Sequence, residues 1–194
     1  VTERRKRARR DQVLALAERL RRTTSIERRK TPPSDEFFAR YYACNVPVVF
    51  TDYTEGWAAR SWTPAWLRST FRGVEIEIAS SRSGDPHADR NLDSHREKTT
   101  MDAYVDRVLA AGTSNDIYTV ANNKNMDRPE FQRLLDDVVF RPDYLRPDHI
   151  KGGTSFWLGP SGTTTSFHHD TTNILFHQLY GKKRFVLVAA TNAA

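Results

Sequence analysis

The sequence predicts an α+β fold, with helices concentrated toward the N-terminus and strands dominating the C-terminal third. Apolar residues recur at helical spacing in several segments before residue 140. Residues 153–188 are instead rich in Thr and Phe, which favour strands. The chain has 194 residues, 38% hydrophobic and 28% charged, which is enough for one domain with a buried core.

Basic charge is concentrated at the start of the chain. The whole chain has a formal net charge of +6, but residues 1–30 hold 12 Lys and Arg against 4 Asp and Glu. The remaining residues are slightly acidic, so the basicity belongs to an arm and not to the domain. We therefore divide the chain into a basic arm and helix, residues 1–30, and a domain, residues 31–194.

The composition points to a protein of a reducing compartment. No apolar run approaches the roughly 18–20 residues of a membrane span, and we expect neither membrane contact nor a signal peptide. The single cysteine, Cys44, cannot form an internal disulfide, so we expect a cytoplasmic protein. Because the first residue is Val1 and the chain stops at Ala194, we expect a fragment cut at both ends.

Two helices and a strand are predicted in the first fifty residues. Residues 1–10 are expected to be a mobile basic run, and residues 11–22 carry an amphipathic pattern with Asp11 as N-cap. Ser34 is the expected N-cap of a second, aromatic-rich helix, and residues 47–50 form the first strand.

A helix, a strand and a long polar loop follow. Thr63-Pro64 opens the helix with proline at its first position, and residues 74–78 alternate as a strand with one solvated face. Residues 80–98 have no periodicity, which predicts an exposed loop. Its histidines, His87 and His95, have no metal-ligand spacing, so we interpret both as solvated.

Three further elements precede the C-terminal third. Residues 100–111 have helical spacing that uses Leu109 among its apolar positions, and residues 116–120 are predicted to form a strand. Arg128-Pro129 opens a helix that runs through Val139.

The C-terminal third contains a His-x-Asp motif. His168 and Asp170 lie two residues apart in a segment predicted to be a strand, where side chains at i and i+2 point to the same face. A His nitrogen and an Asp oxygen on one face are two of the three ligands used by non-haem Fe(II) oxygenases. His169 faces the other way and is interpreted as non-ligating.

A second pair of residues suits a carboxylate. Thr165 lies three residues before His168, and Lys183 lies thirteen residues after Asp170, beyond a turn at Gly181. A lysine charge and a threonine hydroxyl together match a carboxylate group. Iron beside a carboxylate anchor implies a 2-oxo acid as co-substrate.

Three motifs carry a resemblance to a known family. They are Trp157-x-Gly159-Pro160, Thr165-x-x-His168-x-Asp170 and Gln178-x-x-Gly181-x-Lys183-Arg184. Together they resemble the first half of a cupin-like JmjC domain, the family of the Fe(II)- and 2-oxoglutarate-dependent protein hydroxylases. The resemblance implies N-terminal helices packed on a double-stranded β-helix, the cupin or jelly-roll barrel, which would be incomplete in this chain.

The resemblance also implies a set of ligands. Fe(II) would be held by His168, Asp170 and a second histidine located beyond Ala194. The residues implied in cofactor binding are Thr165, Lys183, Tyr118 and Asn173, and Asn122 would contact substrate. A core role explains Tyr118 nearly as well, and His177 is a less favoured replacement for the missing ligand. The family usually has Asn four residues after the Asp, where this chain has Ile174.

The implied function is hydroxylation of a protein or peptide side chain, with no catalytic residue beyond the metal site. This chain alone, one ligand short, is expected to be inactive. Two alternatives stay open: a non-catalytic cupin-type binding module, and an RNA-modifying oxygenase in which residues 1–30 contact nucleic acid. The substrate and the oligomeric state are not indicated by the sequence.

Overall fold

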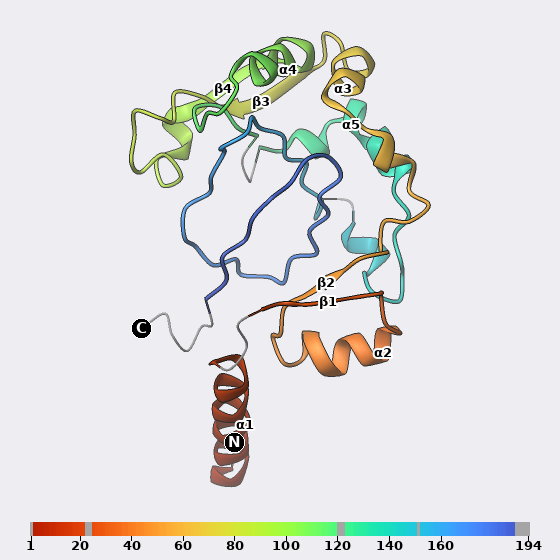
Figure 1. Ribbon diagram of the computed structural model, residues 1–194, viewed down its shortest axis with the longest axis vertical. Coiled ribbons are helices and arrows are strands. Elements are labelled where there is room, and N and C mark those ends of the chain that lie inside the picture. Colours follow the sequence, from red (N-terminus) through yellow and green to blue (C-terminus); the bar gives the residue numbers. More distant parts are fainter. Residues whose placement is uncertain (1, 22–24, 120–122, 151, 189–194) are drawn as a thin grey trace. The chain divides into compact units, whose positions relative to one another are not determined.

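The computed structural model describes residues 2–21, 25–119, 123–150 and 152–188. The chain divides into two compact units, one formed by residues 1–55 with 182–194 and the other by residues 56–181. Both units contain helices and small two-stranded sheets (Figure 1). The boundary at residue 30 between arm and domain stays a prediction.

The first helix is longer than predicted. Helix α1 spans Glu3–Arg21, so the expected mobile run at residues 1–10 and the N-cap at Asp11 are wrong. Arg, Lys and Ala are good helix formers, and an ion pair one turn apart joins Lys6 to Glu3 at 2.8 Å. These local preferences extend the helix without any need for an apolar stripe.

A parallel pair of short strands follows. Strand β1, Glu27–Arg29, pairs with β2, Val48–Phe50, in the register Glu27↔Val48. The predicted strand at residues 47–50 is thereby confirmed, whereas β1 was not predicted because its three residues are all charged. The hydroxyl of Tyr41, a residue that is 2% exposed, donates to Glu27 at 2.8 Å and ties β1 to the helical segment.

That helical segment consists of α2, Ser34–Phe37, and a π-helical turn η1, Phe38–Tyr42. Pro33 occupies the N-cap position, without a side-chain cap hydrogen bond. The predicted helix is therefore present, but Ser34 is its first residue and not its cap.

In the second unit, strands and helices build a core. Strand β3, Glu75–Ala79, pairs antiparallel with β4, Arg96–Thr100. Helices α3, Pro64–Thr70, and α4, Met101–Ala110, contact each other, and α4 lies beside the sheet (Figure 1). The side chains of Ile76 and Ile78 alternate inward and are almost fully buried.

Both helices begin at a threonine whose side chain caps the first turn, and the predicted Pro64 start is confirmed. Thr63 accepts a hydrogen bond from the Trp66 N–H at 3.1 Å, and Pro64 holds the first helical position. Thr100 caps α4 in the same way. Two details differ from expectation: Leu109 is 59% exposed, and residues 96–98, predicted to be loop, pair with β3.

The predicted helix at residues 128–139 is present in two pieces. Helix α5, Pro129–Gln132, continues into a 3-10 turn η5, Arg133–Asp137. The Phe131 ring packs on Phe71 with centroids 4.9 Å apart. The remaining short 3-10 helices are η2 Ala58–Ser61, η3 Leu92–His95, η4 Asn125–Asp127 and η6 Pro147–His149.

The strands expected at residues 116–120 and 153–188 are not formed as ladders within the described residues. Only isolated bridges occur there, Ala79↔Tyr118 and Thr113↔Ser161. A strand needs a neighbouring strand to which its backbone is hydrogen-bonded. No strand in the described part of the chain pairs with residues 163–188. No closed barrel is therefore formed by these ranges.

No helix in the described ranges is both long and apolar enough to cross a bilayer.

Candidate metal centre

The His-x-Asp motif brings together two atoms of a kind that can bind a metal ion. The Nε2 atom of His168 lies 3.9 Å from Oδ2 of Asp170, and both side chains are about half exposed. The motif lies in an irregular segment and not in the predicted strand. The two side chains thus lie close together, as predicted. The reason given for it, the alternation of side chains along a strand, does not apply, because no strand is formed here.

A backbone carbonyl orients the His168 ring. The Nδ1 atom lies 2.7 Å from the carbonyl oxygen of Ser166. A carbonyl oxygen can only accept, so Nδ1 carries the proton and donates it. Nε2 of the neutral ring then holds a lone pair, which is the form of histidine that binds a metal ion.

This donor set fits a divalent transition metal. Two neighbouring ligands of one such ion lie about 3 Å apart, so the two half-exposed side chains, now 3.9 Å apart, would have to move closer to hold a metal together. Imidazole nitrogen and carboxylate oxygen are ligands that suit Fe(II). Across the described ranges, no cluster of three or more His, Cys, Asp or Glu side chains is found, so the described pair could supply at most two of the ligands of such an ion.

Separation alone does not identify a metal site in this chain. His149 Nε2 and Asp148 Oδ2 are 3.8 Å apart, also on exposed side chains. What distinguishes His168 is the carbonyl that sets its tautomer and the buried network to which Ser166 connects.

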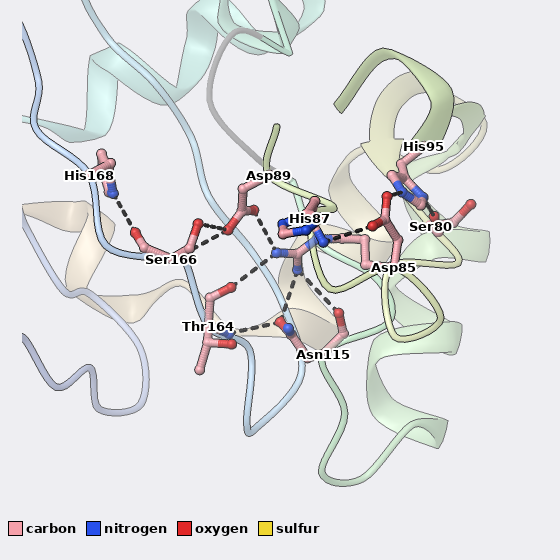
Figure 2. Close-up of polar contacts among 10 residues, drawn as sticks. Ser80, Asp85, His87, Asp89, His95, Asn115, Thr164, Ser166 and His168 are labelled. Carbon is pink, nitrogen blue, oxygen red and sulfur yellow. Dashed lines mark hydrogen bonds and ion pairs between the residues drawn. The ribbon is translucent and has the colours of Figure 1, made fainter. Parts of the chain in front are cut away.

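Arg82 is the centre of that network. It is 2% exposed, and its guanidinium donates to Asp89 Oδ1 at 2.9 Å and to the Thr164 carbonyl at 3.0 Å. It also donates to the carbonyl and the side-chain oxygen of Asn115, at 3.2 and 3.0 Å. The dashed lines converging between Asp89, Thr164 and Asn115 in Figure 2 mark these bonds.

Asp89 joins this cation to the segment that carries His168 and Asp170. Its Oδ2 accepts from both the N–H and the hydroxyl of Ser166, each at 2.7 Å. Burial is the largest influence on the pKa of Asp89 and favours its neutral form. The Ser166 bonds and the Arg82 charge together outweigh burial, so the pKa lies below its ordinary value and the carboxylate stays ionised.

A second carboxylate in the same loop holds a histidine. His95 Nε2 lies 3.1 Å from Asp85 Oδ2, and its Nδ1 lies 3.0 Å from the Ser80 carbonyl (Figure 2). Both ring nitrogens face acceptors, so only imidazolium donates to both. Asp85 raises the pKa of His95, and His95, then Asn91 and the His87 N–H, lower the pKa of Asp85 to about 2.

The expectation that His95 is a solvated loop residue is therefore wrong, because its side chain is only 11% exposed and is partnered on both sides. The expectation for His87 is confirmed: its side chain is exposed.

The other predicted site residues are scattered. Thr165 and Asn173 are exposed in the irregular segment. Tyr118 is 6% exposed, with its ring 5.6 Å from the Arg82 guanidinium carbon, a burial that matches the core alternative. Lys183 belongs to the other compact unit, where its Nζ lies 5.7 Å from the Phe185 ring.

The roles assigned to these residues stay predictions, as does the pairing of Lys183 with Thr165. Asn122 lies outside the described residues.

His177 has the environment of a structural histidine. Its ring packs on Trp57 with centroids 4.6 Å apart. Burial lowers its pKa to about 4, so the ring is neutral at physiological pH. His169 is exposed, and its expected non-ligating role stays a prediction.

Sequence reasoning missed the supporting residues of the network, Arg82, Asp89, Asn115 and Ser166. The concentration of Ser, Asp and His in residues 80–98 was the one available signal. Their contacts join positions far apart in the chain, 77 residues in the case of Asp89 and Ser166, which no local pattern encodes.

Comparison with known proteins adds an independent finding. The model of the cupin-like domain family matches residues 34–194. JmjC domain-containing protein E of Dictyostelium discoideum is 24% identical over 186 residues, which cover 84% of this chain and 52% of that protein.

Two animal proteins are similarly related. The human bifunctional peptidase and (3S)-lysyl hydroxylase JMJD7 is 22% identical over 162 residues, covering 80% of this chain and 51% of that protein. Jumonji C domain-containing protein 5 of Drosophila melanogaster is 24% identical over 190 residues, covering 91% and 45%. The chain thus spans about half the length of these curated relatives.

Proposed function

The chain belongs to the cupin-like domain family, and from this premise we propose that the intact protein is an Fe(II)- and 2-oxoglutarate-dependent oxygenase that hydroxylates a protein side chain. The family includes JmjC-named relatives, one of which is named as a lysyl hydroxylase. The proposal includes a double-stranded β-helix as the complete fold.

One observation carries the proposal. The Nε2 atom of His168 lies 3.9 Å from a carboxylate oxygen of Asp170, and the Ser166 carbonyl accepts from Nδ1, which leaves Nε2 as the ring nitrogen for a metal. This is the donor pair that a facial triad needs from a His-x-Asp motif. The third ligand in the proposal is a histidine beyond residue 194.

The proposed reaction balances with O₂ as the oxidant. One oxygen atom enters succinate as 2-oxoglutarate loses CO₂, and the other enters a C–H bond of the substrate. Fe(II), when bound, supplies the activation of O₂. His168 and Asp170 would hold the metal, with the His168 ring oriented by the Ser166 carbonyl, which accepts from Nδ1.

The co-substrate would be anchored by charge. Lys183 and Thr165 are proposed to bind the distal carboxylate of 2-oxoglutarate, with one ammonium charge and one hydroxyl donor. We also propose that Asn173 and Tyr118 bind this co-substrate and that Asn122 contacts the substrate. A protein substrate is proposed because the human relative is named for lysyl hydroxylation.

A second candidate function involves nucleic acid. Helix α1 is one continuous helix, Glu3–Arg21, whose Lys and Arg side chains at positions 4–10 are exposed. A row of exposed cations of this kind neutralises phosphates. An RNA-directed oxygenase would use the same metal site with a different substrate.

A metal titration tests the proposal. Anaerobic binding of Co(II), a coloured substitute for Fe(II), is measured with the intact protein and with His168→Ala and Asp170→Ala. Loss of an outer-shell residue typically weakens metal binding about 10- to 100-fold, so loss of a direct ligand is expected to cost more than about 100-fold.

The matched control is the other exposed His–Asp pair. Because His149 and Asp148 are 3.8 Å apart, His149→Ala and Asp148→Ala remove the same groups and leave Co(II) binding unchanged. Equal losses in both pairs would indicate non-specific surface binding and contradict the proposal.

A further inference from the structure

We propose that Asp89, held in place by Arg82, is a positioning residue for the metal site. Through Ser166 it fixes the backbone that orients the His168 ring, although it touches neither metal nor substrate. The inference rests on the proposed function, because the metal it concerns is the one that function requires.

A continuous chain of hydrogen bonds connects the two ends. Arg82 donates to one oxygen of Asp89 at 2.9 Å, and the other oxygen accepts both Ser166 donors at 2.7 Å. The Ser166 carbonyl accepts the Nδ1–H of His168 at 2.7 Å. Figure 2 shows Ser166 between Asp89 and His168. The tautomer of His168 thus depends on the position of the Ser166 carbonyl. The backbone N–H and the hydroxyl of Ser166 both donate to Asp89.

Side-chain hydrogen bonds, and not strand pairing, hold the backbone of residues 163–170. Residues 163–170 pair with no strand among the described residues, so a sheet ladder does not hold this backbone. Instead Arg82 binds the Thr164 carbonyl at 3.0 Å, and Asn115 accepts the Thr164 N–H at 2.9 Å. The side-chain network takes the place that a neighbouring strand has in a regular sheet.

Burial makes this network costly to rearrange. The Arg82 side chain is 1% exposed and that of Asp89 is 24% exposed. A buried cation is stable only when it is paired and hydrogen-bonded, so the guanidinium keeps its partners in one arrangement. A segment bound to such a fixed charge spends more of its time in the metal-binding geometry, and metal affinity rises with that fraction.

The decisive variant is Asp89→Asn. An amide has the shape of a carboxylate but only one acceptor oxygen. It cannot accept from Arg82 with one atom and from Ser166 with the other, so the chain of hydrogen bonds breaks without a change in size.

The matched control is Asp85→Asn. Asp85 lies in the same loop, its side chain is 23% exposed, and each of its oxygens also accepts from a partner. Those partners are His87, Asn91 and His95, which do not include any residue of the segment that carries His168 and Asp170.

The experiment measures Co(II) affinity and the visible spectrum of bound Co(II) in the intact protein, together with the midpoint of urea unfolding. Asp89→Asn is expected to weaken Co(II) binding about 10- to 100-fold and to alter the spectrum. Asp85→Asn is expected to leave both unchanged. Equal effects on binding in the two variants, or none in Asp89→Asn, would overturn the inference.

A second pair of variants decides the matter if Asp89→Asn does not fold. Ser166 is exposed, and Ser166→Ala removes its hydroxyl bond to Asp89 while the Arg82 ion pair stays intact. It is expected to weaken Co(II) binding, and Ser166→Thr, which keeps the hydroxyl, is expected to restore it. Unchanged affinity in Ser166→Ala would then count against the inference.

His168→Ala separates this inference from the function on which it rests. If that variant binds Co(II) as tightly as the wild type, the proposed metal site itself is wrong. If it loses the metal while Asp89→Asn and Ser166→Ala keep it, the site stands and only the positioning role fails.

Discussion

The carboxylate of Asp89 accepts two hydrogen bonds from Ser166, one from its backbone N–H and one from its hydroxyl, each 2.7 Å long. The two residues are 77 positions apart. Their contact connects the polar loop after β3 with the segment that carries His168 and Asp170. A loop without periodicity in the sequence is thus a supporting part of the candidate metal centre.

Lys183→Ala is expected to weaken 2-oxoglutarate binding in the intact protein. Removing the cation leaves the distal carboxylate unpaired, a loss of roughly 2–5 kcal/mol, or one to three orders of magnitude in affinity at about 1.4 kcal/mol per tenfold. The neighbouring Lys182→Ala is the control. Calorimetric titration with 2-oxoglutarate measures the affinity, and an equal loss of Fe(II) binding in Lys183→Ala would indicate misfolding instead of a lost anchor.

The His95–Asp85 pair is expected to make stability depend on pH. The folded pKa of His95 is raised above 6.5, so its contribution is complete below about pH 6.5 and is lost as pH rises through the folded pKa. The pKa of Asp85 is lowered from 3.8 to about 2, so its contribution is complete above about pH 4 and is lost as pH falls toward 2.

His95→Gln should therefore reduce the free energy of unfolding more at pH 5.5 than at pH 9, as measured by urea denaturation. His87→Gln changes an exposed histidine of the same loop and is the control, expected to change stability by no more than about 0.5 kcal/mol at either pH. A cost of His95→Gln that is the same at both pH values would show that the pair is not ionised as described.

Ile78→Ala is expected to destabilise the second unit substantially. Ile78 is 1% exposed on the inner face of β3, and truncation of a buried isoleucine to alanine costs about 2–5 kcal/mol. Leu109→Ala, at a position 59% exposed, should change stability by no more than about 0.5 kcal/mol. Urea unfolding compares the two, and similar costs would contradict the burial pattern of this unit.

Deletion of residues 1–30 tests the nucleic-acid alternative. If α1 contacts RNA, the intact protein binds a single-stranded RNA probe with an affinity that falls as salt rises, and the deletion removes that binding. Binding that survives the deletion would assign the RNA contact to another surface. No binding in either protein would leave the basic arm without a role in substrate choice.

Local patterns predicted the elements whose stability is local. The strand at residues 74–78 alternates cleanly, Pro64 marks the start of one helix, and apolar spacing marks the helix at residues 100–111. Strand β1 escaped notice because all three of its residues are charged. The strand propensity of residues 153–188 did not produce strands, because propensity without a hydrogen-bonded neighbour does not form a ladder.

The candidate site was predictable only in part. The spacing of His168 and Asp170 singled out the pair, and the two side chains do lie together. What orients them depends on contacts between distant positions, such as that of Arg82 with the Thr164 carbonyl. Such contacts follow from tertiary packing and leave no periodicity in the sequence.

Succinate formation from 2-oxoglutarate is the most direct test of the proposed function. It is measured with the intact protein in the presence of Fe(II) and O₂, comparing the wild type with Asp170→Ala and with the control Asp148→Ala. The account predicts that wild type and control form succinate, whereas Asp170→Ala forms none above background. Undiminished succinate formation by Asp170→Ala would contradict the assignment of this metal site.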